Sequence, residues 1–110
     1  MAYDEELADR IRALLGDRAG LTEKKMFGGL AFLIGGNMAI AASGQGGILV
    51  RVDPDESDEL VTSSPAEPME MRGRKMPGWL RVGSGDVADD VALAEWVERG
   101  AGYASSLTRK

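Results

Sequence analysis

The stretch over residues 24–32 constrains the fold more than any other part of the chain. Its sequence is Lys-Lys-Met-Phe-Gly-Gly-Leu-Ala-Phe, so large apolar residues lie on both sides of a glycine pair. Gly28 and Gly29 lack a Cβ, which lets the backbone bend sharply or approach another segment closely. The flanking residues suit extended structure. We therefore predict a kinked or bulged first strand near the middle of the core.

The first half of the chain predicts a helix followed by strands. Residues 3–15 have the 3.6-residue apolar period of an amphipathic helix, and its buried face is predicted to hold Leu7, Ile11, Leu14 and Leu15. After the kinked strand, glycine-rich turns separate three further apolar runs, at residues 30–34, 38–42 and 48–52. These runs predict a half-buried antiparallel meander.

The second half predicts two more helices and two short strands. Asp53 and Pro54 are a cap and a first helical residue, so a helix is expected from there to about residue 61. Strands are expected at 69–71 and 79–82, with a cationic loop at 72–78 between them, and a last helix from about 89 to 107. The order is helix, four strands, helix, two strands, helix. It predicts a single α+β domain over residues 1–110 with a mainly antiparallel sheet.

The composition argues against catalysis and against cofactors. The chain has no histidine and no cysteine, so the usual general base and any thiolate nucleophile or ligand are missing. The glycine clusters at 28–29 and 44–47 do not match a phosphate loop and do not join a strand to a helix. The acidic run at 53–59 lacks calcium-loop spacing. We expect no enzyme activity, no metal and no cofactor.

The best surface candidates are cations. If the cationic loop folds beside the first strand, a positive patch forms, and its expected members are Lys24, Arg72, Arg74, Lys75 and Arg81, with Lys25 and Arg51 nearby and Met76 and Trp79 flanking the loop. Such a patch can contact phosphate, nucleic acid or an acidic partner surface. The alternative is internal pairing with the acidic run that precedes the loop.

The overall charge narrows the partners. A formal net charge of −5 disfavours broad nucleic-acid binding, which needs many cations against phosphates. No apolar run approaches the length needed to cross a bilayer, and the acidic start lacks the features of a secretion signal. We therefore expect a cytoplasmic protein without a membrane partner.

Several motifs resemble the N-terminal domain of the TfoX/Sxy family. They are Lys-Lys-Met-Phe-Gly-Gly-Leu-Ala-Phe at 24–32, the hairpin at 35–38, Met-Pro-Gly-Trp at 76–79 and Leu-Ala-Glu-Trp-Val at 93–97. The resemblance implies an α+β fold in which the motif residues have structural roles: Lys25, Met26, Phe27, Gly28, Gly29 and Phe32. It also implies a bacterial regulator of DNA-uptake competence acting with a cyclic-AMP receptor protein. The best-known members carry a second, C-terminal domain, whereas we expect this chain to be a stand-alone N-terminal-like domain.

These observations favour a non-enzymatic regulatory or interaction module that works through a protein partner, with transcription machinery as one candidate. Two alternatives remain: nucleic-acid binding through the basic loop at 72–75, and binding of a small anion near Arg51, Arg81 or the glycine turns. We also expect a weak homodimer, formed by a poorly charged strand edge within 30–52 or by the face of the last helix that carries Gly100, Ala101 and Ala104. The alternative is a monomer in which a helix covers the strand edge.

Overall fold

The computed structural model describes residues 3–26, 28–44, 46–71 and 73–107. Its elements are α1 (Glu5–Leu15), β1 (Leu21–Met26), β2 (Gly29–Ile34), β3 (Asn37–Ala42), β4 (Ile48–Arg51), α2 (Pro54–Ser63), β5 (Glu67–Met71), β6 (Arg74–Val82), the short 3-10 helix η1 (Ser84–Val87) and α3 (Asp90–Ser106). One six-stranded sheet has the order β1-β2-β3-β4-β6-β5, and every pairing is antiparallel. The predicted α+β class and element order are confirmed.

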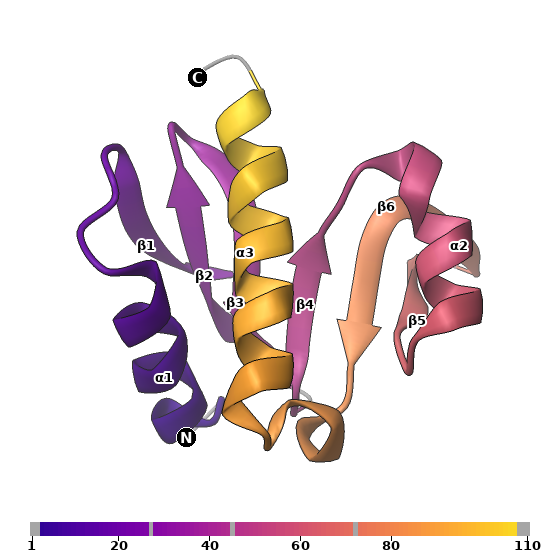
Figure 1. Cartoon of the computed structure of the whole chain (residues 1–110), viewed down its shortest axis with the longest axis horizontal. Helices are drawn as coiled ribbons and strands as arrows, with labels where there is room; N and C mark the ends of the chain where they lie inside the picture. Colours follow the sequence, from indigo (N-terminus) through magenta and orange to yellow (C-terminus); the bar gives the residue numbers. More distant parts are fainter. Residues whose placement is uncertain (1–2, 27, 45, 72, 108–110) are drawn as a thin grey trace.

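The helices form a layer on one face of the sheet (Figure 1). Helix α3 packs on β2, β3 and β4 and also contacts α1, while α2 packs on β5 and β6. Between this layer and the sheet lies the main core, whose largest fully buried side chains include Phe32, Ile11, Leu15, Ile40 and Leu93. We call this side of the sheet the helix face.

Each helix begins at an aspartate that satisfies backbone donors. The N–H of Leu7 donates to Asp4 Oδ1 at 3.1 Å, and Asp53 and Asp89 accept from the second backbone N–H of α2 and α3. The predicted helix starts are therefore confirmed to within about two residues, as expected for a local signal. One detail of α1 was wrong: the side chain of Leu14 is 37% exposed rather than buried.

The glycine pair forms a hairpin, so the predicted kinked strand is wrong. Gly28 has a φ of 74°, which allows the chain to reverse between β1 and β2. Gly29 begins β2 beside β3, where a Cβ would lie 2.1 Å from the carbonyl oxygen of Ala42. As a result β1 lies at the edge of the sheet and not in the middle of the core.

The predicted cationic loop is also wrong, because most of it belongs to β6. This strand runs from Arg74 to Val82 and pairs with β4 on one side and β5 on the other. The β5–β6 register shifts between Pro68 and Glu70, and the extra β6 residues include Pro77 and Gly78. Neither Pro77 nor Gly78 has a paired residue in the two registers, so they form an irregular middle of β6 whose two ends are paired. The backbone N–H of Val52 donates to the carbonyl oxygen of Gly78 at 2.8 Å.

Of the two surfaces predicted to form a dimer, one is buried inside the chain and the other belongs to interior strands of the sheet. Gly100, Ala101 and Ala104 are buried in the main core of their own chain. The edges of the sheet are β1 and β5, whereas the poorly charged strands within 30–52 are interior. Glutamate and lysine side chains on β1, and Glu67, Pro68 and Glu70 on β5, discourage edge-to-edge pairing.

Candidate interaction face

A second apolar cluster lies on the side of the sheet away from the helices. Its buried members are Ala31, Met38, Ala41 and Leu49, and Met26, Leu33, Met69 and Trp79 pack against them while partly exposed. No helix residue of the described ranges belongs to this cluster. We call this side the open face. The predicted half-buried meander was wrong in this respect, because β3 is buried on both faces and β2 nearly so.

The strand registers place charged residues on both flanks of this cluster. Directly paired residues share a face, and one continuous row crosses the sheet in the order Lys24, Ala31, Ala41, Leu49, Arg81 and Glu67. The centre of the row is apolar. A lysine from β1 lies on one flank, and an arginine from β6 lies on the other.

Arg51 adds a third cation beside this row. It lies opposite Trp79 and is therefore a diagonal neighbour of Arg81 on the β4–β6 pair. Its guanidinium carbon is 5.1 Å from the centroid of the Trp79 ring and 5.6 Å from that of Tyr103, which belongs to α3. Within the described residues, no carboxylate forms an ion pair with Arg51. Two aromatic rings therefore orient a guanidinium whose donors are not committed to an acid.

The ion pairs of the described chain lie elsewhere. They join Arg10 to Asp90, Arg12 to Asp9 and Glu23, Arg18 to Glu98, and Arg99 to Glu56. All of them involve at least one helix or the loop after α1. The alternative of internal pairing between the acidic run and Arg74 or Lys75 is not seen among the described residues.

The sequence-predicted surface residues do not form one patch. Lys24 and Met26 are on the open face with Trp79 and Arg81, whereas Lys25 lies opposite Leu30 and therefore on the helix face. The strand order puts β6 four positions away from β1, so Arg74 and Lys75 lie far across the sheet from Lys24. Of the motif residues, Phe32 is fully buried in the main core and Gly29 lies close to the backbone of Ala42. Phe27 and Arg72 lie outside the described residues.

The beginning of β6 faces a different environment. Lys75 and Met76 line a pocket of about 350 Å³ between α2 and β6, together with three prolines, Pro54, Pro68 and Pro77. Arg74 is exposed at the start of the strand. This pocket is separate from the row of open-face residues.

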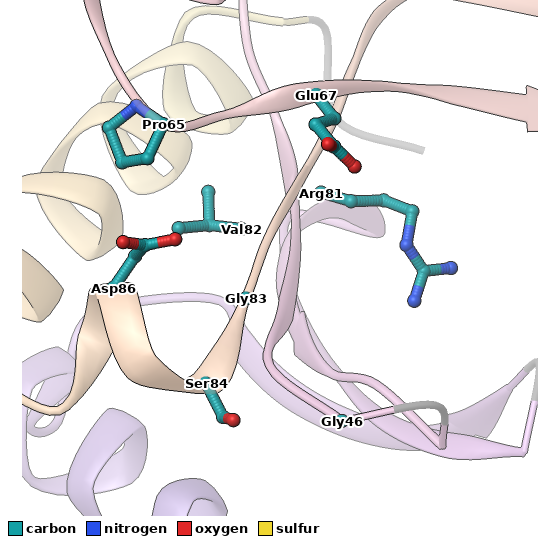
Figure 2. A pocket seen from close by; sticks show the side chains of 8 residues that line it. All are labelled: Gly46, Pro65, Glu67, Arg81, Val82, Gly83, Ser84 and Asp86. Atoms are coloured by element: carbon teal, nitrogen blue, oxygen red, sulfur yellow. The ribbon is translucent and has the colours of Figure 1, made fainter.

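A polar pocket of about 390 Å³ lies where β6 leads into η1 (Figure 2). Arg81 and Gly46 line it, which brings together two features of the predicted anion site, but Glu67 and Asp86 line it as well. The only hydrogen bond of the Arg81 side chain among the described residues goes to Ser43 Oγ, at 3.4 Å. Two carboxylates against one guanidinium disfavour a phosphate or another small anion in this pocket. Arg51 does not line it.

The clearest pKa perturbation is on the helix face. Arg12 donates hydrogen bonds to both carboxylate oxygens of Glu23, at 2.7 and 2.8 Å. These bonds hold the pKa of Glu23 below its ordinary value and raise that of Arg12. This pair joins α1 to β1 and is a structural link. Among the described residues, no three acidic side chains gather in a way that could hold a metal ion, and no helix is long and apolar enough to cross a membrane.

These features define an α+β domain, with helices on one face of an antiparallel sheet and a second apolar cluster on the other. A family model for the TfoX N-terminal domain matches residues 13–104, and the chain belongs to this family. The match runs from within α1 to near the end of α3 and includes all six strands. The resemblance stated from the motifs is confirmed. A search of curated proteins found no match.

Sequence reasoning had selected Lys24, Trp79, Arg81 and Arg51 but missed the apolar centre of the open face. Leu33, Met38 and Leu49 were assigned to strands without a role. A signal was present, because the runs at 30–34 and 38–42 are apolar at successive positions, a pattern typical of strands buried on both faces.

Proposed function

We propose that this protein is a cytoplasmic, non-enzymatic interaction module that acts by binding a regulatory partner protein on its open face. The observation that carries the proposal is an apolar cluster on a sheet face that no helix of the described chain covers. The centre of this cluster is at most 5% exposed, and its surface is formed by partly exposed side chains, Met26, Leu33, Met69 and Trp79. Apolar side chains that gather on one face of a small domain suit a contact site. Membership of the TfoX N-terminal family supports a regulatory partner, including one from the transcription machinery.

The side chains at the surface of the cluster suit protein recognition. Methionine adapts its shape to a partner, and Met26 and Met69 are both partly exposed here. Trp79 contributes a large aromatic surface, and aromatic residues and arginine are enriched where binding energy concentrates. Arg51 and Arg81 lie beside it.

Direct binding of nucleic acid is less well supported. Single-strand binders stack successive bases on several aromatic rings, whereas the only aromatic ring in the described cluster of the open face is that of Trp79. The centre of the face is aliphatic, and the net charge of −5 opposes association with phosphate backbones.

A matched pair of charge insertions tests the proposal. Leu33→Glu places a carboxylate on the open face, while Leu14→Glu places one at an exposed position of α1 on the other side of the molecule. Each tagged variant and the unmodified protein are used to capture partners from cell lysate, after circular dichroism has shown that they are folded. We expect Leu33→Glu to lose a partner that Leu14→Glu retains. If both variants recover the same partners, the open face is not the binding site.

A further inference from the structure

We propose that α2 is a detachable element of the fold. It loses its contacts with the sheet as a unit while the rest of the domain stays folded, and it then uncovers an apolar part of β5 and β6. This inference goes beyond the proposed function, because α2 packs on the helix face and the proposed contact site lies on the open face.

Few side chains anchor α2. Of its ten residues only Ser57 and Leu60 are buried, and Val61 packs partly buried against the main core. Helix α1 buries four of its eleven residues, and α3 buries six of its seventeen. Since most of the stability of a helix in a protein comes from the packing of its apolar face, α2 is the most weakly held of the three helices.

The contact of α2 with the sheet is also incomplete. A pocket of about 350 Å³ lies between one side of the helix and β6, and its walls include Ser57 and Val61 of α2 and Met76 and Leu80 of β6. Helix α2 covers the end of the sheet formed by β5 and β6, whereas α1 and α3 pack on each other over the remaining strands (Figure 1). Detachment of α2 therefore leaves the packing of the other two helices in place.

Like charges weaken α2 further. The segment from Asp53 to Glu59 carries five carboxylates and no basic residue. Asp55 and Glu59 are four positions apart, so they are neighbours on the helix surface and repel each other. Among the described residues, the ion pair of α2 joins Glu56 to Arg99 at 4.0 Å, between side chains that are 54% and 41% exposed. A pair this exposed to water contributes little.

The chain on both sides of α2 is anchored, so the moving unit has clear limits. Before the helix, Val52 is fully buried, and its backbone N–H donates to the carbonyl oxygen of Gly78 at 2.8 Å. After the helix, Ala66 is 3% exposed and belongs to the main core. Residues 53–65 can therefore move without breaking the strand pairing of β4 or β5.

Detachment of α2 uncovers paired residues of the last two strands. Leu80 of β6 lies opposite Pro68 of β5, and Leu80 is 1% exposed with α2 in place. Both residues line the pocket beside α2, so they lie on the side of the sheet that this helix covers. The elements of a protein that move in binding and regulation come from its least stable parts, and α2 has the properties of such an element.

Native-state hydrogen exchange tests the inference on the unmodified chain. Relative to their intrinsic rates, the backbone amides of residues 58–63 in α2 should exchange at least about tenfold faster than the slowest amides of α3 and β3. Their exchange should also respond less to low concentrations of urea, because detachment of α2 exposes less surface than unfolding of the domain. Equal protection and equal urea dependence would show that α2 opens only when the whole domain unfolds, which would overturn the inference.

A variant of α3 separates local detachment from global unfolding. Val97 is fully buried, so Val97→Ala should speed exchange in α3 and β3 about tenfold through the loss of apolar contacts. It should leave exchange in α2 unchanged, because the closed form and the form with α2 detached lose the same contacts. If Val97→Ala speeds exchange in α2 by the same factor as in α3, the inference is wrong.

The matched variant on α2 is Leu60→Ala, which removes the buried apolar side chain of this helix. We expect it to speed exchange of the α2 amides at least about tenfold. Exchange in α2 that is unchanged by Leu60→Ala would show that this contact does not hold the helix on the sheet, and it would contradict the inference.

The charge of α2 provides a test in the opposite direction. Glu59→Lys replaces the repulsion from Asp55 by an attraction at the same spacing, and it should slow exchange of the α2 amides about threefold relative to their intrinsic rates. Glu59→Gln removes the charge without reversing it and should slow exchange less. An unchanged or faster rate in Glu59→Lys would contradict the weakening of α2 by its own charges.

Discussion

The two faces of the sheet bury different kinds of apolar side chain. The helix face holds an aromatic ring and branched residues such as Phe32, Ile40 and Val50, which have few rotamers and pack against fixed helices. Alanines occur on both faces, but the methionines Met26, Met38 and Met69 all belong to the open face, together with Leu33, Leu49 and Trp79. Stiff side chains suit a permanent core, and adaptable ones suit a contact that forms and dissociates. The comparison therefore associates the helix face with permanent packing and the open face with the more adaptable side chains.

The charges divide in the same way. On the helix side, Arg10, Arg12 and Arg18 each pair with a carboxylate of the chain itself. Arg51 instead lies against the rings of Trp79 and of Tyr103 on α3, and Lys24 is exposed; neither forms an ion pair within the described residues. The ion pairs of the described residues therefore involve arginines of the helices and of the loop after α1.

The largest expected difference between the faces comes from two consecutive residues of β2. Phe32 is fully buried on the helix face, whereas Leu33 is partly exposed on the open face. We expect Phe32→Ala to lower the free energy of unfolding by about 3–5 kcal/mol and Leu33→Ala to lower it by about 1 kcal/mol. Urea denaturation followed by tryptophan fluorescence measures both. Equal losses would show that the open face supports the fold as much as the helix face does.

A smaller effect is expected from two glycines of α3. A Cβ at Gly100 would lie 2.5 Å from the carbonyl oxygen of Ala39 and 2.9 Å from a methyl group of Val50, while a Cβ at Gly102 would meet nothing within 4 Å. Gly100→Ala should destabilise the protein by about 2–3 kcal/mol, because it pushes α3 away from the sheet. Gly102→Ala should stabilise it by about 0.5–1 kcal/mol through helix propensity.

Thermal and urea unfolding of the two glycine variants check this pair. The same substitution two positions apart on one helix should change stability in opposite directions. If Gly100→Ala left the free energy of unfolding unchanged, the contact between α3 and β3 would not be as close as the structure shows.

The elements that could be predicted from sequence are those with local signals. Asp53 followed by Pro54 marks the start of α2, and Asp89 marks that of α3, because a cap acts on the backbone within a few residues. The hairpin after β2 and the loop before β4 were likewise predicted from their glycines. Of the apolar runs predicted as strands, β4 alternates between the two faces, since Val50 lies in one cluster and Leu49 in the other.

The errors involve contacts between distant parts of the chain. A glycine pair permits either a kink or a reversal, and the outcome here includes the approach of Gly29 to Ala42, thirteen positions away. The segment with Pro77 and Gly78 has turn chemistry, but the residues on both sides of it pair with β5, and those after it also pair with β4, so that it continues one strand. The contact of Arg51 with Trp79 and Tyr103 joins three elements, and no sequence spacing indicates it.

The smallest expected effect concerns the ion pair that links α1 to the edge strand β1 on the helix face. Among the described residues, the open face has no ion pair to compare with it. Arg12 donates two hydrogen bonds to Glu23, and these bonds lower the pKa of Glu23 in the folded state. A carboxyl whose folded pKa is lowered stabilises the protein above its unfolded pKa, near 4.5, and that contribution is lost as the pH falls below it.

We therefore expect Glu23→Gln to reduce the free energy of unfolding at pH 7 by no more than about 1 kcal/mol, because both side chains are at least one-third exposed and water screens the pair. Below about pH 4 the difference from the unmodified protein should shrink towards zero, since protonated Glu23 and glutamine are then both uncharged. Chemical denaturation at a series of pH values measures it. In an Arg12→Gln background the same substitution should show little pH dependence, because the donor that lowers the pKa is absent. If the difference in free energy of unfolding between Glu23→Gln and the unmodified protein grew on acidification, the pair would not stabilise the folded state. The ion pair on the helix face would then not distinguish the two faces energetically.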